Sequence, residues 1–328
     1  MIEILAATLV AMVIAMLAGP RYIRWLHQRG IGQNIRELTP ERHSSKQGTP
    51  TMGGVLILGA AFIPYLIFAT KTVPSLVVFI LAFGSGAIGL ADDLIKQRQH
   101  RSLGLSARTK LLLQVPLVAV AVFIALRFGG VDSSLTVPFV RSGLVIGGFY
   151  YVFAFFLIAG FSNAVNLTDG LDGLAAGTVA VALFAYAGIA FLRGETDLAV
   201  LAACLTGASV GFLWYNSHPA AVFMGDTGSL ALGAGLAGIA IATETEILVL
   251  LIGGLFVAEA LSVMIQVVSF RVFHKRVFLM APLHHHFELK NWSESKIIVR
   301  LWIVAAILAA AGFVLYYLSN KYIGPPGG

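Results

Sequence analysis

Charged residues are scarce in this chain, and their scarcity excludes an ordinary soluble protein. Asp, Glu, Lys and Arg make up 12% of the 328 residues, and 58% of the residues are hydrophobic. A soluble domain carries about 25% charged residues. The chain also lacks the alternating segments of about 10 residues that build a membrane β-barrel, because its apolar runs are about 20 residues long. We therefore predict an all-α integral membrane protein.

Cysteine is almost absent as well. Cys204 is the only cysteine, and it lies in an apolar run, so no internal disulfide framework is expected. A Gly-rich Walker loop is also missing, which argues against transport driven by nucleotide hydrolysis. We expect no separate soluble domain, no tandem repeat and no nucleic-acid partner.

Ten apolar runs make up most of the chain, and we predict that each one forms a membrane-spanning helix. The first run has no basic segment before it, so we interpret it as a span and not as a cleaved leader. Together the runs would form one membrane domain over residues 1–328. They cover residues 2–19, 52–70, 74–91, 107–126, 143–162, 174–192, 198–215, 229–243, 246–270 and 298–319.

Lysine and arginine gather in alternate connections, and this pattern predicts the orientation of the chain. Basic residues favour the cytoplasmic side of a membrane. The segments that follow the odd-numbered runs hold 17 of the 22 basic residues, all within 21–46, 96–110 and 271–300. We place these segments in the cytoplasm and both termini outside. Losing one run from the count would reverse half of the loops, but the distribution argues against that. On the outer side, 131–141 is expected to form a small hairpin.

Two acidic segments lie at the predicted cytoplasmic ends of helices. LADDLIK (90–96) contains the adjacent Asp92 and Asp93, and FMGDTGS (223–229) places Asp226 between two glycines. Neighbouring carboxylates repel one another unless they share a cation, and Mg²⁺ binds carboxylates together with substrate phosphates. The alternative for the first segment is an exposed Asp92–Lys96 ion pair. The alternative for the second is a helix start capped by a hydroxyl of Thr227 or Ser229.

The stretch NAVNLTDGLDGLAAG (163–177) combines four polar side chains with three glycines. Asn163, Asn166, Asp169 and Asp172 recur every three residues. Such groups beside hydrocarbon are costly and therefore suggest function. A step of three turns a helix by about 300°, so the four groups do not form one stripe. Either the helix stops near 168–170 or the groups line a broad cleft. A plain polar turn between two helices is the alternative.

Histidine is concentrated in PLHHHFE (282–288). Three consecutive imidazoles can bind metal, donate hydrogen bonds to phosphate or transfer protons, and a histidine-rich surface loop is the alternative.

KQGTPT (46–51) leads into the second run, where a lysine and threonines next to flexible backbone suit phosphate binding; a basic anchor is the alternative there. Glu259 and Gln266 share one face of the ninth run, where we expect a structural role.

All of these segments lie on the same predicted side of the membrane. They combine carboxylates with lysine, asparagine and histidine, which favours Mg²⁺-assisted chemistry on a phosphate-bearing substrate. The membrane setting suggests that one substrate is a lipid.

The chain resembles the polyprenyl-phosphate N-acetylhexosamine-1-phosphate transferases over essentially its whole length. The resemblance rests on four motifs: LADDLIK, NAVNLTDGLDGLA, FMGDTGS and PLHHHFE. The motif PLHHHFE and the basic segment before it resemble the corresponding segment in the branch of this family that uses a muramoyl substrate. The resemblance implies Mg²⁺-dependent transfer of phospho-N-acetylmuramoyl-pentapeptide from UDP-MurNAc-pentapeptide to undecaprenyl phosphate, with release of UMP and formation of lipid I. It further implies a peptidoglycan-synthesis enzyme of the bacterial inner membrane that forms a homodimer.

The resemblance also implies roles for individual residues. Asp226 would be the main Mg²⁺ ligand, with Asp92 or Asp93 nearby, and Asp92, or else Asp93, would activate the lipid phosphate. His285 would take part in catalysis. Direct attack by the lipid phosphate and a two-step route through an aspartyl-phosphate both stay open. The expected substrate-binding residues are Lys46, Thr51, Lys96 and Lys110 for phosphates, Asn163, Asn166, Asp169, Gly170, Leu171, Asp172, Asn216 and Phe223 for the uridine and sugar-phosphate pocket, and His284, His285 and His286 for its rim.

Two other functions share features of this sequence. A related transferase that uses UDP-GlcNAc would share most motifs, and PLHHHFE argues for the muramoyl substrate instead. An ion-coupled transporter would place acidic residues near the middle of the membrane on several helices. Here the acidic residues of the motifs lie at predicted cytoplasmic ends, and Glu259 is the one that lies within an apolar run.

Overall fold

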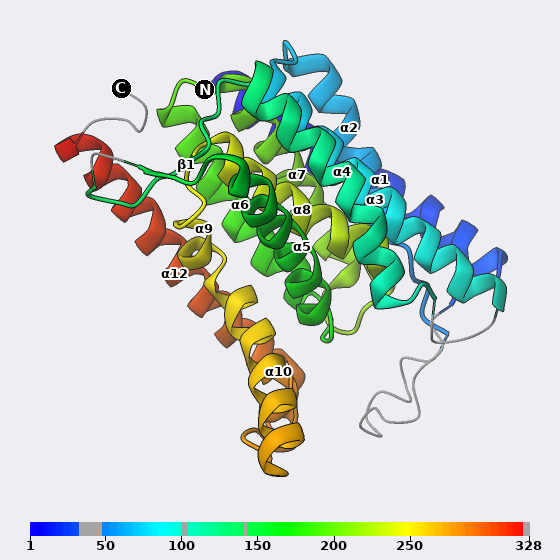
Figure 1. The fold of residues 1–328 in the computed structure, drawn as a ribbon. Coiled ribbons are helices and arrows are strands. Elements are labelled where there is room, and N and C mark those ends of the chain that lie inside the picture. The colour runs from blue at the N-terminus through cyan, green and yellow to red at the C-terminus, as the bar shows by residue number, and fades with distance from the viewer. Residues whose placement is uncertain (33–47, 100–103, 141–142, 324–328) are drawn as a thin grey trace.

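The chain forms a bundle of long helices (Figure 1). The computed structural model describes residues 1–32, 48–99, 104–140 and 143–323. Its elements are α1 (Ile2–Gln28), α2 (Gly54–Phe68), α3 (Val73–Gln99), α4 (Ala107–Phe128), β1 (Ser134–Leu135), β2 (Leu144–Val145), the 3₁₀ turn η2 (Gly147–Phe149), α5 (Tyr150–Thr168), α6 (Leu174–Leu192), α7 (Thr196–Asn216), α8 (Gly225–Ala242), α9 (Val249–Ile252), α10 (Gly254–Phe273), α11 (Leu283–Leu289) and α12 (Glu294–Ile323).

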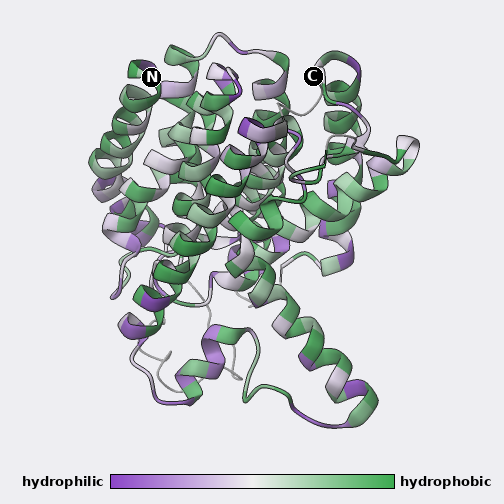
Figure 2. Cartoon of the chain, turned by 90° about the vertical axis from the view of Figure 1, so that its left-hand side faces the viewer, coloured by the Kyte–Doolittle hydropathy of each residue, from purple (hydrophilic) through white to green (hydrophobic). Residues whose placement is uncertain are grey.

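The all-α membrane architecture predicted from the sequence is confirmed. Every predicted run contains a helix, and in the described ranges nine helices are long and apolar enough to cross a membrane. α2 is apolar but has 15 residues. Hydrophobic residues cover the flanks of the bundle between its two ends (Figure 2). The start of α1 and the end of α12 lie at the same end of the bundle (Figure 1).

Two predicted runs differ from the observed helices. The ninth run, expected as one helix over 246–270, is divided at Gly253, where α9 ends and α10 begins. A side chain at Gly253 would collide with the ring of Phe161. α10 then leaves the bundle (Figure 1). The fifth run, expected over 143–162, starts with β2 and η2, and its helix runs on to Thr168.

The predicted hairpin before the fifth run is present but extends further than expected. Ser134 pairs with Val145 and Leu135 with Leu144 in a two-stranded antiparallel sheet. The second strand therefore lies beyond residue 141, within the run 143–162 that was predicted to be helical.

α8 is the central helix, and small residues allow its neighbours to approach it closely. Every residue from Asp226 to Ala242 is buried. Helices in a bilayer associate mainly through close packing, which small residues permit. Gly54 of α2 lies against the backbone of Gly228, and Gly89 of α3 lies against the carbonyl group of Asp226. The start of α8 is thereby held directly beside α3.

α1 and α7 use the same kind of contact. The buried face of α1 is built from alanines at intervals of four, including Ala7, Ala11 and Ala15. On α7, Gly207 lies against the backbone of α1. Cys204 lies one turn away on α7 and is 0% exposed, so the single cysteine is an apolar core residue of the bundle.

We expect Gly54→Ala to lower the melting temperature of the purified protein in detergent. The added methyl group would meet the backbone of Gly228 and the carbonyl carbon of Thr227, neither of which can rotate away. Overpacking of this kind costs about 1–3 kcal/mol.

Gly59→Ala is the matched control on α2, because a methyl group there meets no other atom within 4 Å. Alanine favours helix over glycine by about 1 kcal/mol, so this variant should melt at or above the wild-type temperature. Equal melting temperatures for the two variants would contradict the close α2–α8 packing.

Candidate functional site

Three aspartates from two helices meet where the end of α3 packs against the start of α8. Asp92 and Asp93 lie near the end of α3, and Asp226 lies in the first turn of α8. All three are buried, and one oxygen atom from each lies within 4.8 Å of the others. The structure thus brings together three of the residues that the sequence singled out, although 133 or more positions separate Asp226 from the other two.

Asp93 holds the first turn of α8. Its Oδ1 accepts a hydrogen bond from the Asp226 amide at 3.2 Å, and its Oδ2 accepts from the Thr227 amide at 3.0 Å and the Thr227 hydroxyl at 2.7 Å. A carboxylate at a helix N-terminus satisfies amides that have no partner within the helix and interacts favourably with the helix dipole. Of the two capping groups weighed from the sequence, Thr227 donates to Asp93, whereas Ser229 donates to the carbonyl of Gly225.

Two lysines neutralise the other two carboxylates. Lys96 Nζ lies 2.6 Å from Asp92 Oδ2 and 2.8 Å from Asp226 Oδ1. Lys110 Nζ lies 3.2 Å from Asp92 Oδ1 and forms an ion pair with Asp226 Oδ2. Asn166 also donates to Asp226 Oδ2, at 3.3 Å. The predicted Asp92–Lys96 pair is confirmed, but it belongs to a buried network and not to an exposed helix end.

The donor set of this cluster fits a hard divalent cation. Three ionised aspartates and two lysines leave one net negative charge. Asp92 Oδ2 is buried and accepts no hydrogen bond from the residues that the structure describes, although Lys96 is its ion-pair partner. Carboxylate oxygens are the ligands that Mg²⁺ prefers, usually one or two of them together with substrate phosphates. Asp92 and Asp226 are therefore the residues that could hold such an ion.

The connection between α5 and α6, residues 169–173, forms a neighbouring wall. α5 ends at Thr168, which agrees with the predicted stop near 168–170. Burial and the carboxylates of Asp226, Asp93 and Asp172 raise the pKa of Asp169 well above its usual range. Asp169 is therefore electrostatically coupled to the aspartate cluster. Asn163, in contrast, donates to the carbonyl of Ala159 one turn back on α5, at 2.7 Å.

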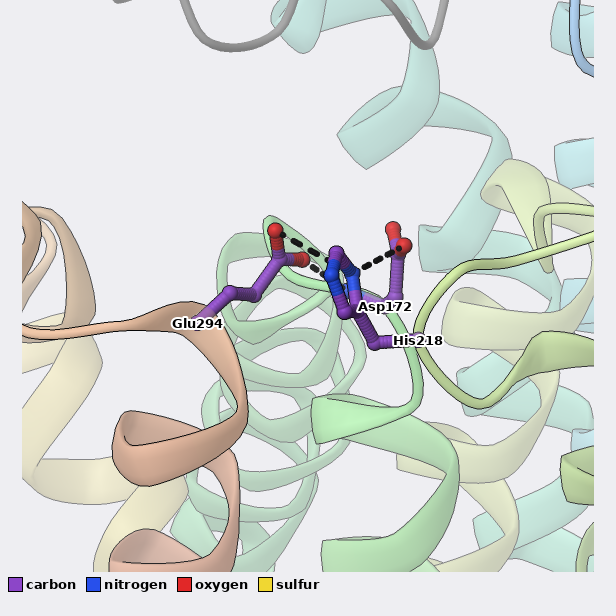
Figure 3. A group of neighbouring side chains, drawn as sticks. All are labelled: Asp172, His218 and Glu294. Atoms are coloured by element: carbon purple, nitrogen blue, oxygen red, sulfur yellow. Dashed lines mark hydrogen bonds and ion pairs between the residues drawn. The ribbon is translucent and has the colours of Figure 1, made fainter.

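Asp172 belongs to a second polar cluster, with His218 and Glu294 (Figure 3). His218 Nδ1 lies 3.0 Å from Asp172 Oδ2 and 3.4 Å from Glu294 Oε2. The three residues come from the α5–α6 connection, the segment after α7 and the first turn of α12. The predicted pocket residue Asp172 thus contacts distant parts of the chain.

The three histidines of PLHHHFE have different environments. His284 and Glu259 are both 0% exposed, with His284 Nδ1 3.3 Å from Glu259 Oε1, and the His284 ring packs directly against Gly170. His285 Nδ1 pairs with Glu288. His286 Nδ1 accepts a hydrogen bond from the Leu279 amide. Burial and the nearby Lys290 lower the pKa of His286. Most of the motif forms the short helix α11, so it is not an exposed loop.

The other predicted site residues fall into three groups. Lys46 lies outside the described residues. Thr51 and Phe223 lie beside the cluster: Thr51 Oγ1 is next to Gly225, and the Phe223 amide donates to the Pro50 carbonyl at 2.7 Å. Leu171 and Asn216 have structural contacts. Leu171 packs in an apolar cluster with Leu174, Leu255 and Ile297, and Asn216 Nδ2 donates to the Val222 carbonyl.

Several residues around the site were not assigned a functional role from the sequence. Thr227 was considered only as a capping group, and Glu259 was expected to be structural. An acidic residue in an apolar run is a recognisable signal, and it could have drawn more attention to Glu259. Glu294 gave no signal, because nothing in a helix-starting glutamate reveals a partner 122 residues away.

Comparisons with known proteins converge on one family. A family model described as glycosyl transferase family 4 matches residues 75–244, and a phospho-N-acetylmuramoyl-pentapeptide-transferase signature matches residues 46–58. The phospho-N-acetylmuramoyl-pentapeptide-transferase of Rubrobacter xylanophilus is 47% identical, over 97% of this chain and 98% of the relative. The enzyme of the same name from Desulfitobacterium hafniense is 45% identical, over 96% and 98% of the two chains.

We expect Asp93 and Thr227 to be energetically coupled. In a double-mutant cycle of Asp93→Ala and Thr227→Val, the coupling in the free energy of unfolding should be on the order of 1–3 kcal/mol, as for a hydrogen bond to a charged group. The measurement is denaturant unfolding in detergent micelles.

Thr206→Val is the control, because the Thr206 hydroxyl donates to the carbonyl of Ala202 on its own helix. Its effect should add to that of Asp93→Ala without coupling. If the Asp93 and Thr227 variants were likewise additive, the assignment of Asp93 to the start of α8 would be wrong.

Proposed function

The chain belongs to the phospho-N-acetylmuramoyl-pentapeptide transferases, and from that premise we propose which of its residues carry the reaction. It is a multi-pass bacterial membrane enzyme that forms lipid I in peptidoglycan synthesis. Its proposed substrates are UDP-MurNAc-pentapeptide and the lipid carrier undecaprenyl phosphate, with UMP as the second product. The observation that carries the residue assignments is the convergence of Asp92, Asp93 and Asp226 with two lysines.

We assign Mg²⁺ to Asp226 and Asp92. A bound Mg²⁺ would withdraw charge from the pyrophosphate of the nucleotide substrate and stabilise the departing UMP. Lys96 and Lys110 hold both carboxylates in place, and their ammonium groups neutralise the phosphate oxygens that approach the cluster. Asn166, which donates to Asp226, keeps that carboxylate in one orientation.

Asp92 and Asp93 have different parts in this proposal. Both oxygens of Asp93 accept hydrogen bonds from the first turn of α8, so we assign it to positioning Asp226. Within the described residues, the partner of Asp92 Oδ2 is the flexible Lys96 side chain. Asp92 is therefore the residue that we propose to orient the lipid phosphate and to accept its proton.

The uridine and sugar-phosphate pocket is proposed beside the cluster, around the α5–α6 connection. Asn163, Asn166, Asp169, Gly170 and Asp172 would line it, together with Asn216 and Phe223. Leu171 would support it from the apolar core, where it is packed. His285 and His286 would form the rim of this pocket, and the buried His284 would hold Gly170 in place through the contact of its ring.

Three further features belong to the proposal. The active site faces the cytoplasm and both termini lie outside, as the distribution of basic residues predicts. Residues 1–328 form one membrane domain, and the enzyme assembles as a homodimer.

We expect purified protein to release UMP from UDP-MurNAc-pentapeptide in the presence of undecaprenyl phosphate and Mg²⁺, and to stop when the metal is chelated. Asp226→Asn should lower the turnover number by at least about 10²-fold, because a charge that stabilises the transition state is lost. Release of UMP is the measurement.

Asp132→Asn is the matched control, since the Asp132 side chain is exposed in the segment before β1. It should turn over like the wild type. Unchanged turnover of Asp226→Asn would remove Asp226 from the reaction. Turnover with UDP-GlcNAc in place of the muramoyl substrate would identify the related transferase activity instead.

The two chemical routes differ in one measurement. An aspartyl-phosphate route predicts that labelled UMP enters UDP-MurNAc-pentapeptide without lipid acceptor. Direct attack by the lipid phosphate predicts no such exchange in a fully active preparation.

A further inference from the structure

The end of the α5–α6 connection is held by two residues that the reaction does not use. Asp172 lies there, His218 follows α7, and Glu294 begins α12 (Figure 3). The three side chains point toward one another, with the His218 ring between the two carboxylates. Segments from three parts of the chain therefore meet at one residue of the proposed pocket.

Asp172 is held both by its side chain and by its backbone. Its Oδ2 lies 3.0 Å from His218 Nδ1 and accepts a hydrogen bond from the Ala220 amide, also at 3.0 Å. Its own amide donates to Glu294 Oε1 at 3.0 Å. Because these contacts come from different elements and engage both the side chain and the backbone, Asp172 cannot turn without breaking at least one of them.

The position of His218 between the carboxylates of Asp172 and Glu294 is electrostatically favourable. Two carboxylates this close repel one another, and an imidazole N–H placed between them gives each a donor or a favourable charge. His218 Nδ1 is within 3.4 Å of both. Removal of His218 would leave Asp172 and Glu294 in like-charge contact, so the two carboxylates would move apart.

The conformation of Asp172 affects the rest of the α5–α6 connection because that connection is short. Only residues 169–173 separate α5 from α6. Gly173, with a positive φ of 78°, packs beside Leu213 and the Asn216 carbonyl, so the far end is fixed. A shift of Asp172 would therefore be passed to Gly170, which packs against the His284 ring, and to Asp169, whose carboxyl group interacts electrostatically with Asp226 and Asp93.

We propose that His218 and Glu294 are positioning residues that hold Asp172, and through it the α5–α6 connection, in the shape that binds the nucleotide substrate. This inference rests on the proposed function of that connection. Neither residue touches the reacting phosphates in this assignment. They act on affinity for the UDP-linked substrate and not on the lipid phosphate or on the metal.

The test is steady-state kinetics of His218→Ala and Glu294→Ala. Each should raise the KM for UDP-MurNAc-pentapeptide by about tenfold, the effect of one lost hydrogen bond to a charged group. The turnover number and the KM for undecaprenyl phosphate should stay close to wild type. The KM of the double variant should not exceed the higher of the two single-variant KM values, because both residues act through Asp172. Glu294→Gln, which keeps an acceptor for the Asp172 amide, should restore most of the affinity.

His27→Ala and Glu3→Ala are matched controls at exposed positions of α1, and both should be unchanged. The rise in melting temperature caused by UMP gives a second readout that needs no turnover, and it should be smaller in the two variants than in the wild type. An unchanged KM in either alanine variant would overturn the inference, as would a loss of turnover that leaves both KM values unaltered. A wild-type protein that releases no UMP would instead contradict the proposed function.

Discussion

A carboxylate inside a bundle of apolar helices is stable only where positive charge or hydrogen-bond donors surround it. This requirement decides the geometry at the junction of α3 and α8. Asp93 meets it with the backbone of α8, and Asp92 and Asp226 meet it with Lys96 and Lys110. Gly89 and Gly54 allow the backbones to approach closely enough for these contacts to form. The packing of the bundle and the charge of the site therefore depend on the same few residues.

The segments from α10 to α12 support the site without adding to its carboxylate cluster. His284 of α11 lies under Gly170, and Glu294 of α12 binds the amide of Asp172. Glu259 of α10 holds His284 in turn, in a fully buried pair. The connection between α5 and α6 thus has supports from segments that follow it by more than 100 residues. A bilayer offers no hydrophobic force between helices, so such polar contacts can define where two segments meet.

Sequence patterns predicted the helices and the type of chemistry, but few of the tertiary contacts between residues that are distant in the sequence. Long apolar runs indicate spans because hydrocarbon thickness sets their length, and all ten runs contain helices. The division at Gly253 could not be predicted, because the apolar pattern continues through it and the Phe161 ring that requires glycine there is distant in the sequence. The Asp92–Lys96 pair follows from helical spacing, whereas Lys96 also binds Asp226, 130 residues away. Spacing could not distinguish Asp92 from Asp93 either, since neighbouring residues on α3 differ only in what faces them. The comparisons bear out the family resemblance.

The burial of Cys204 has a practical consequence for studying motion in this protein. A thiol enclosed in the middle of α7 is out of reach of maleimide and nitroxide reagents that approach from water. Two cysteines, one introduced on α11 and one on the α5–α6 connection, would then be the only accessible thiols in the native chain. The distance between spin labels at these two positions could follow the movement of α11 during turnover, with the natural sequence otherwise intact.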